Sequence, residues 1–206
     1  MTTRNAATMG SYGATWAHNG YAGCGNVQEL VGTLKGRVAL VIGSGDGVFN
    51  DIKNAQSKIG KLAVVFAVND IGMFLPVVDH WVSLHGQNLG AWKNVRWLHP
   101  REREYTKYHS VDSYPYIDYV WQELTPVFSL SGYFAMQIAS IMDAEQIILC
   151  GCPGDATRRF FDLDSHFSYD KEGVRAQVEH EMARLPEFKA KVRSMSGWTR
   201  DYFGGL

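Results

Sequence analysis

The amino-acid sequence predicts an α/β protein with a mostly parallel central sheet and helices on both faces. The first observation is a set of short, continuous runs of β-branched and apolar residues, such as RVALVI at Arg37–Ile42 and QIILC at Gln146–Cys150. Continuous runs of this kind are typical of strands that are buried on both faces of a parallel sheet. The second observation is that helical patterns alternate with these runs, which favours right-handed crossover connections.

The composition is that of a globular protein that needs no disulfide or metal for stability. Apolar residues make up 46% and charged residues 20% of the 206-residue chain, close to the averages for soluble domains. The formal net charge of -1 gives no support for general nucleic-acid binding, which requires a basic surface. The sequence shows no signal-peptide core and no apolar stretch of the roughly 20 residues that span a membrane. We therefore expect a cytoplasmic protein without membrane contacts.

The three cysteines do not predict a disulfide framework, because small disulfide scaffolds are shorter and use even numbers. Cys150 ends an apolar run, so we expect a buried, reduced thiol. The pair Cys150 and Cys152 is also compatible with redox or metal chemistry, but the chain has no second cysteine pair that would complete a zinc site.

We expect a single domain over residues 26–206, preceded by an N-terminal arm over residues 1–25. The arm lacks helical or strand periodicity, and its Trp16 and Tyr21 suggest that it docks on the domain or on another subunit. Its aromatic residues and the C-terminal Met195–Thr199 segment would also suit contacts in a homo-oligomer.

The expected strands follow one another along the chain, and each ends at a polar residue or glycine. They are Arg37–Ile42, Lys61–Val68, Asp79–Leu84, Val95–Leu98 and Gln146–Cys150. The expected helices are a short one from an Asn26 cap to Leu34, Val48–Ile59 ending at Gly60, Gly132–Met142 with Ser129 or Ser131 as N-cap, and a helical tail over Asp170–Arg193 that restarts at Pro186. Residues 100–128 are rich in Tyr, His and Pro, and we expect an irregular insertion or lid there.

The loop after the first strand is the first candidate ligand contact. It consists of Gly43, Ser44, Gly45, Asp46 and Gly47, directly before the predicted helix. Glycines permit close backbone approach, and the free amides at a helix start favour an anion. The loop does not complete the dinucleotide fingerprint, because Val48 stands at the third glycine position, and it has no Walker lysine. The aspartate suits a ribose hydroxyl or a metal better than a phosphate. The alternative is a tight strand-to-helix turn without a ligand.

Two further candidates follow the second and third strands. Asn69 and Asp70 come where the second strand ends, and an asparagine there can recognise a base or sugar edge with its donor and acceptor. His85 follows the third strand and is a candidate general acid or base, or a phosphate ligand. The alternatives are an Asx turn at Asn69 and an exposed, backbone-bonded imidazole at His85.

The last candidates lie around the fifth predicted strand. Ser131 and Gly132 open the helix before it, and offer a second anion site or plain helix capping. Gly151 follows the strand, and a polar loop then carries Arg158, Arg159, Asp162, Asp164 and His166. The two aspartates offer hard oxygen ligands for a cation such as Mg²⁺, the arginines can pair with phosphate, and His166 is a second candidate acid or base. The aromatic segment from Tyr105 to Trp121 suits base stacking, or equally a satellite core or a subunit interface.

These residues carry a resemblance. VALVIGSGDG, AVND, DHWVSLH and SLSGYFAMQIASIMDAEQIILCG resemble, in order, the motifs of a Rossmann-like superfamily. It joins archaeal 6-hydroxymethylpterin diphosphokinase-like domains, flagellin motility-accessory glycosyltransferases and small bacterial sialyltransferases. The resemblance covers roughly residues 37–151. Phage and prophage proteins also look similar, including their ending, which is similar to VRSMSGWTRDYFG here.

The resemblance implies a Rossmann-like fold and a pocket for a nucleotide or a pterin, in the cytoplasm of a bacterium or a phage-infected host. The matching donor-binding positions are Gly43, Ser44, Gly45, Asn69, Ser131, Gly132 and Gly151, and His166 is the nearest match to the catalytic histidine of the sialyltransferase-like members. The chain departs from the family where G-P-S is replaced by Asp46-Gly47-Val48, so the serine that would bond to phosphate is missing.

We therefore expect a transferase that uses a nucleotide-activated donor, glycosyltransferase-like in its chemistry, with His85 or His166 deprotonating the acceptor. A pterin-type diphosphokinase that uses ATP and Mg²⁺ is a related alternative. A non-catalytic protein that binds a nucleotide-like ligand, or a phage accessory protein, is the alternative from another class, because fold alone does not decide function.

Overall fold

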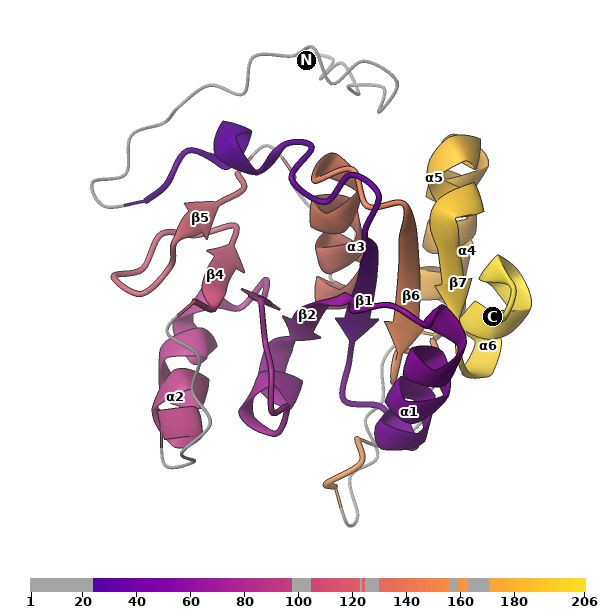
Figure 1. Cartoon of the computed structure of the whole chain (residues 1–206), viewed down its shortest axis with the longest axis horizontal. Coiled ribbons are helices and arrows are strands. Elements are labelled where there is room, and N and C mark those ends of the chain that lie inside the picture. Colours follow the sequence, from indigo (N-terminus) through magenta and orange to yellow (C-terminus); the bar gives the residue numbers. More distant parts are fainter. Residues whose placement is uncertain (1–23, 98–104, 123, 125–129, 156–158, 163–170) are drawn as a thin grey trace.

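A computed structural model describes residues 24–97, 105–122, 124, 130–155, 159–162 and 171–206 (Figure 1). Within these residues the strands form one 7-stranded sheet in the order β5-β4-β3-β2-β1-β6-β7, and every pair is parallel. The strands are β1 (Val38–Ile42), β2 (Val64–Val68), β3 (His80–Val82), β4 (Lys107–Ser110), β5 (Tyr119–Val120), β6 (Gln146–Cys150) and β7 (Val192–Ser194). The α/β, Rossmann-like prediction is confirmed.

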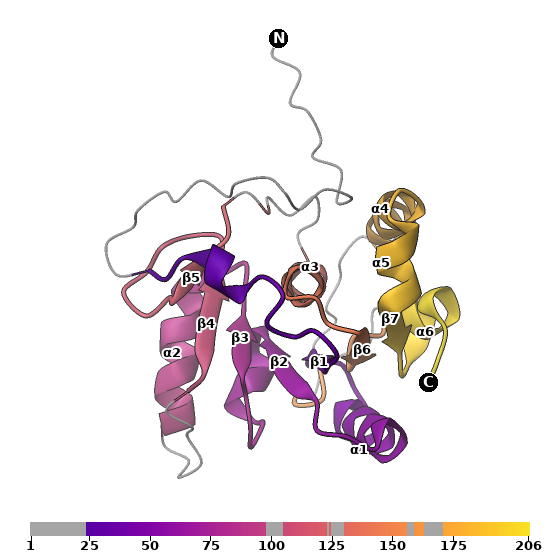
Figure 2. The same ribbon diagram turned by 45° about the horizontal axis from the view of Figure 1, so that its top comes forward.

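Helices connect the strands and cover both faces of the sheet (Figure 2). The α-helices are α1 (Val48–Ile59), α2 (Gly86–Trp97), α3 (Ser131–Ile141), α4 (Lys171–Ala183), α5 (Pro186–Lys191) and α6 (Gly197–Phe203); two 3-10 helices are η1 (Val27–Leu30) and η2 (Asn69–Met73). None of the helices in the described residues is long and apolar enough to cross a bilayer.

The strand order changes direction at β1. The chain runs outward from β1 through β2, β3, β4 and β5, and then returns to place β6 and β7 on the other side of β1. In doubly wound sheets the loops on the two sides of such a reversal diverge, and ligands bind at the carboxyl ends of the strands there. The topology therefore predicts that a ligand would bind at the loops that follow β1 and β6.

The core consists of two clusters, one on each face of the sheet. Successive side chains of a strand point to opposite faces. Accordingly Ala39 and Val41 of β1 pack in the cluster of α3, α4 and α5, whereas Leu40 and Ile42 pack in the cluster of α1, η2 and α2. All five residues of β1 are buried, which is the reason that this strand reads as a continuous apolar run.

The helix predicted after the first strand is confirmed with the same bounds. Gly60 ends α1 in the left-handed conformation with φ of 64°, as expected of a glycine C-cap. At the other end Gly47 is the N-cap, also left-handed at φ of 78°, and no side chain caps the helix. The short helix after Asn26 forms only as the 3-10 turn η1, with the Asn26 side chain accepting from Gln28 N as predicted.

The strand predicted over Val95–Leu98 is wrong, because Val95 to Trp97 continue helix α2. The buried Arg96 explains this placement. Its guanidinium donates to the main-chain oxygens of Gly72 and Leu75 and thereby anchors the helix on the turn after η2. A short apolar run does not by itself distinguish a strand from a helix. Here the hydrogen bonds of Arg96 to Gly72 and Leu75 favour the helix.

Three strands were missed. β4 and β5 lie within residues 100–128, which were expected to be irregular, and β7 was predicted as the end of the helical tail. β5 and β7 are edge strands of two and three residues, too short to show a period. In β7 the spacing from Phe188 to Val192 imitates a helical repeat, although both residues are buried as expected.

The C-terminal segment is part of the fold. Trp198 and Tyr202 of α6 stack with ring centroids 5.1 Å apart, Arg175 of α4 lies over Trp198, and Lys189 of α5 lies over Tyr202. These contacts pack the aromatic side chains of α6 against α4 and α5, and the homo-oligomer predicted for this segment stays a prediction. The N-terminal arm, with Trp16 and Tyr21, lies outside the described residues.

Candidate ligand site at the carboxyl ends of the strands

The fold brings most of the predicted site residues to one edge of the sheet. Parallel strands place the loops after β1, β2, β3 and β6 at the same edge. α3 begins at this edge as well, because the Ser131 hydroxyl accepts from Leu84 N, just after β3, at 3.2 Å. The predicted residues that lie along this edge are Gly43, Ser44, Gly45, Asp46, Gly47, Asn69, Asp70, His85, Ser131, Gly132 and Gly151. His166 lies outside the described residues, as do Asp164 and Arg158.

The loops after β1 and β6 pack directly against each other. Gly43 N donates to Cys150 O and Gly45 N donates to Gly151 O, both at 2.9 Å. A Cβ at Gly43 would lie 2.7 Å from Cys152 Sγ, and one at Gly45 would lie 2.8 Å from Gly151 O. The glycines are thus required by backbone-to-backbone packing, and this part of the loop contacts protein.

The second half of the same loop is open. Asp46 and Gly47 are exposed, and the Asp46 carboxylate accepts from Gly47 N at 3.0 Å. That bond places a negative charge at the start of α1, where the helix dipole stabilises it. A phosphate at the same place would meet like charge, so the geometry agrees with the expectation that Asp46 suits a hydroxyl or a cation better.

Asn69 has a left-handed backbone with φ of 57°, one of two non-glycine residues with positive φ in the described chain. Its main-chain oxygen accepts from Trp81 Nε1 at 2.6 Å, and its Oδ1 accepts from the Ser83 hydroxyl at 2.7 Å. Ser83 Oγ in turn accepts from His85 N. The Asn69 amide is therefore held in one orientation, with Oδ1 engaged and the Nδ2 hydrogens without a partner among the described residues.

Ser131 and Gly132 start helix α3, but Ser131 is not the N-cap. Leu130 is the N-cap and makes no side-chain capping bond; Ser129 lies outside the described residues. The first main-chain bond of the helix runs from Phe134 N to Leu130 O, so the amides before it have no intrahelical acceptor. The helix start therefore presents N–H donors to the strand-end edge.

Arg159 joins the loop after β6 to the end of β2. Its guanidinium forms a bidentate pair with Asp162 at 2.7 and 2.9 Å and a further bond to Asp70 Oδ2 at 3.0 Å. The hydrogen bonds that Arg159 donates to Asp162, together with the charge of Asp70, raise the pKa of Arg159. The arginine expected to pair with phosphate is thus occupied by two carboxylates, and the second oxygen of the buried Asp70, Oδ1, has no partner among the described residues.

A cluster of four phenylalanines lies beside this ion pair. The ring of Phe160 meets Phe49, Phe74 and Phe161 edge-on at centroid distances of 5.0 to 5.1 Å. Phe49 and Phe74 remain 48% and 45% exposed. These rings were not anticipated from the sequence, because they come from α1, the end of η2 and residues 159–162, which only the fold brings together.

His85 is exposed just before α2, and its main-chain oxygen accepts from Asn88 N at 2.9 Å. These hydrogen bonds involve the main chain of His85, so the roles predicted for its exposed imidazole stay predictions. Among the described residues no group of three or more His, Cys, Asp and Glu side chains is placed to hold a metal ion.

The cysteines after β6 are free. Burial raises the pKa of the Cys152 thiol to about 12, and burial also raises the pKa of Cys150. Both side chains are protonated thiols at neutral pH, which does not favour a nucleophilic or redox role.

Asp51 is a positioning residue that the sequence reasoning missed. From α1 its Oδ2 accepts from Gly151 N at 2.9 Å and from the Ser196 hydroxyl at 2.6 Å. One buried carboxylate therefore ties the loops after β6 and β7 to α1. An aspartate in the first turn of a predicted helix is the only signal in the sequence, and it is also explained by the helix dipole.

The sequence predicts that the aromatic segment stacks on a ligand, fills a satellite core or forms a subunit interface. Tyr108 and Trp121 are buried in the core, whereas Tyr105 is 80% exposed. Trp121 Nε1 donates to His109 Nδ1 at 3.0 Å, and His109 Nε2 lies 2.9 Å from His80 Nδ1. Burial lowers the pKa of His80 to about 3 and lowers that of His109 well below its usual value. Both imidazoles are neutral, so each has one donor and one acceptor nitrogen for this chain of bonds.

No protein-family model matches this chain, and no curated protein matches it either.

Proposed function

We propose that the protein binds a nucleotide-like ligand at the carboxyl ends of β1, β2 and β3 and transfers a group from a nucleotide-activated donor, with glycosyltransferase-like chemistry. The observation that carries this proposal is the left-handed backbone of Asn69 together with the hydrogen bonds that orient its amide. A left-handed non-glycine residue costs conformational energy, and such residues gather at binding sites. Here the surrounding bonds orient the amide, and its Nδ2 hydrogens stay available to donate to an acceptor on a base or sugar.

The start of α3 supports the same placement. The amides of Ser131 and Gly132, which have no acceptor within the helix, suit the phosphate or carboxylate of a donor. They lie at the same carboxyl-end edge of the sheet as Asn69 and Ser83. A Cβ on Gly132 would lie 3.9 Å from Cys152 Sγ, which is an ordinary contact distance, so packing against that residue does not require a glycine here. The ligand would lie between the α3 start and the Asn69 amide, with its anionic end at the helix.

The acceptor hydroxyl requires a base. His85 follows β3 and is the described candidate, and His166 is the candidate from the family resemblance. The imidazole that acts as base accepts the proton as the hydroxyl attacks the donor, and the nucleotide leaves with its phosphate stabilised by helix amides.

The first experiment is a thermal-shift titration of the full chain with CMP, UDP, GDP, ATP, CMP-sialic acid, UDP-sugars and a pterin, with and without Mg²⁺. A hundredfold excess over Kd stabilises the fold by about 2.7 kcal/mol. We expect a shift of a few degrees with one nucleotide class. Asn69→Ala should abolish it, whereas Asn54→Ala, at an exposed position of α1, should not.

Absence of a shift over the whole panel would contradict the proposal. A shift that appears only with ATP, Mg²⁺ and the pterin would instead support the diphosphokinase alternative.

A non-catalytic binding protein is the second candidate, and a specific observation favours it. The cation at the strand ends, Arg159, is engaged by Asp70 and Asp162, and the glycine loop is filled by the loop after β6. Electrostatic stabilisation of a leaving phosphate needs cations directed at it. If a ligand from the panel binds and is never turned over, and His85→Gln leaves its affinity unchanged, this candidate replaces the transferase.

A further inference from the structure

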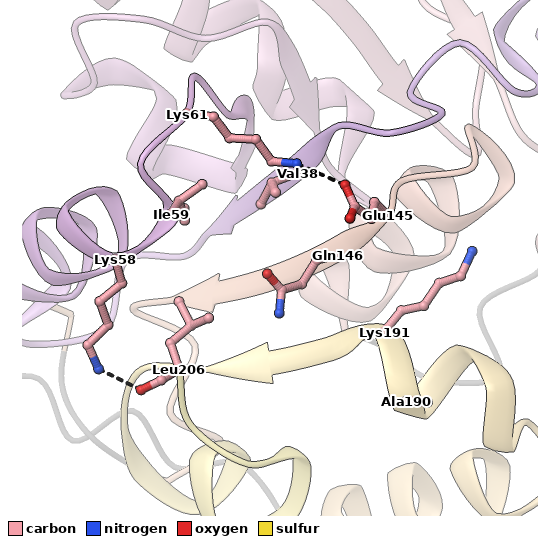
Figure 3. A pocket seen from close by; sticks show the side chains of 9 residues that line it. All are labelled: Val38, Lys58, Ile59, Lys61, Glu145, Gln146, Ala190, Lys191 and Leu206. Atoms are coloured by element: carbon pink, nitrogen blue, oxygen red, sulfur yellow. Dashed lines mark hydrogen bonds and ion pairs between the residues drawn. The ribbon is translucent and has the colours of Figure 1, made fainter.

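A cavity of about 290 Å³ lies at the opposite end of the sheet from the candidate site (Figure 3). Its lining includes Val38 and Gln146, the first residues of β1 and β6. The candidate site lies past Ile42 and Cys150, the last residues of the same strands. The two places are therefore separated by the length of the central strands.

The lining is strongly charged and its sign is mainly positive. Lys58, Lys61 and Lys191 contribute amino groups, and Glu145 is the single acidic residue among the residues that line the cavity. The lysines come from three places: the last turn of α1, the segment before β2 and the end of α5. Lys58 and Lys61 are three residues apart in the sequence, and the fold brings the distant Lys191 to the same cavity.

The interactions that these lysines make within the protein are weak, and an incoming anion can replace them. Lys61 pairs with Glu145 at 2.8 Å and Lys191 with Asp143 at 3.3 Å, between side chains that are 37% to 58% exposed. Lys58 donates to the main-chain oxygen of Leu206 at 2.5 Å. Exposed ion pairs of this kind are close to balanced by hydration, so an incoming anion with two charges can recruit the amino groups by rotation of their flexible stems.

Gln146 gives the cavity a directional contact. Figure 3 shows its amide extending from β6 into the space between Leu206 and the Lys61–Glu145 pair. Neither its donor nor its acceptor has a partner among the described residues. Beside it Val38, Ile59 and Leu206 form an apolar surface, and a few polar groups set against apolar walls are characteristic of small-molecule sites.

We propose that this cavity binds a small phosphorylated metabolite. Lys58 and Lys61 hold its phosphate, Gln146 bonds to a hydroxyl or phosphate oxygen, and the organic part lies on the apolar surface. The cavity is at the lower end of the range for ligand sites, which suits a molecule of the size of a sugar phosphate. The site is independent of the nucleotide-like ligand proposed at the carboxyl ends.

The test is calorimetric titration of the full chain with inorganic phosphate, pyrophosphate and a hexose monophosphate at constant ionic strength. We expect saturable binding that Lys58→Met and Lys61→Met each weaken by about tenfold, because each removes a charge-assisted bond. Gln146→Glu should abolish it by adding a negative charge. Lys53→Met, at an exposed position of the same helix α1, should leave the affinity within about twofold.

A second measurement locates the anion directly. In chemical acetylation followed by mass spectrometry, pyrophosphate should protect Lys58 and Lys61 and leave Lys53 reactive. Tighter binding of the hexose monophosphate than of phosphate identifies a metabolite site, and equal binding identifies a site for free phosphate.

Three results would overturn the proposal. One is the absence of saturable binding for all three anions. Another is an equal loss in Lys53→Met, which would reveal only diffuse surface charge. The third is loss of binding in Asn69→Ala with no effect of Lys58→Met, which would place the anion at the carboxyl ends of the strands.

Discussion

At the scale of single residues, the glycines after β1 and β6 have a steric role that precedes any role in ligand binding. Gly151 has φ of 60°, and a Cβ there would lie 2.6 Å from Gly43 O and 2.7 Å from Val48 Cβ. The sequence motif was read as a ligand loop or as a tight turn. The structure shows a third reason for the glycines, which is the close contact of two neighbouring loops.

Gly151→Ala should therefore destabilise the fold strongly. The left-handed backbone costs an alanine about 1–2 kcal/mol, and the overlap with fixed backbone atoms adds about 1–3 kcal/mol. The free energy of unfolding is measured by urea denaturation. Gly32→Ala is the matched control, because Gly32 has φ of 74° and nothing within 4 Å of a Cβ; it should lose only about 1 kcal/mol. Equal losses in the two variants would refute the packing argument.

At the scale of elements, the C-terminal helices are fastened to the sheet by a stack of aromatic and cationic side chains. The Trp198 ring contacts both Arg175 and Tyr202, and a Cβ on Gly154 would meet it at 2.8 Å. Asp155 pairs with Arg175 and also accepts from Trp198 N at 3.1 Å. The contacts join α4, α6 and the loop after β6, so α6 is an integral part of the domain.

Trp198→Ala should lower the free energy of unfolding by about 2–4 kcal/mol, since it removes a large, half-buried side chain and its stacking partners. The oligomeric state should be the same as that of the unchanged protein, because these contacts are within one chain. Tyr105→Ala is the control, at a side chain that is 80% exposed, and should change stability by less than about 0.5 kcal/mol. A change of oligomeric mass in light scattering, without loss of stability, would instead identify Trp198 as a subunit contact.

At the scale of the whole molecule, the buried His80 and His109 link the fold to pH. They lie on neighbouring strands β3 and β4, stacked against Phe66 and Tyr119. Burial is the main cause of their lowered pKa, and the positive charges of Lys107 and Arg37 lower the pKa of His80 further. The folded state therefore takes up these protons less readily than the unfolded state does.

The direction of the pH dependence follows from this difference in pKa between the folded and the unfolded state. Unfolded histidine has a pKa near 6.5, so the stability from these two groups is complete above that pH and is lost as the pH falls toward the folded pKa of about 3 for His80. Relative to pH 8, we expect a loss of about 1.4 kcal/mol per histidine at pH 5.5. Urea denaturation at both pH values measures it. His109→Gln should reduce the loss, whereas His180→Gln, at an exposed position of α4, should leave it unchanged; a pH-independent stability would contradict this account.

The predictable part of the candidate site is the set of loops that follow buried strands. Asn69, Ser131 and Gly151 are recognisable because a continuous apolar run or a strong helical pattern ends beside each of them. Ser83, Asp51 and the Arg159 cluster were not recognised as a connected set, because their bonds join segments that are distant in the chain.

The sequence by itself determined the α/β class, the central strands β1, β2 and β6 and the bounds of α1, because a strand buried on both faces and a helix between two glycines leave direct patterns. Only the tertiary structure decided the strands β4, β5 and β7, the extension of α2 over Val95, and the placement of Lys191 with Lys58 and Lys61 at the amino ends of β1 and β6. Those features depend on which surfaces meet across the fold, and side-chain contacts between distant segments leave no period in the sequence.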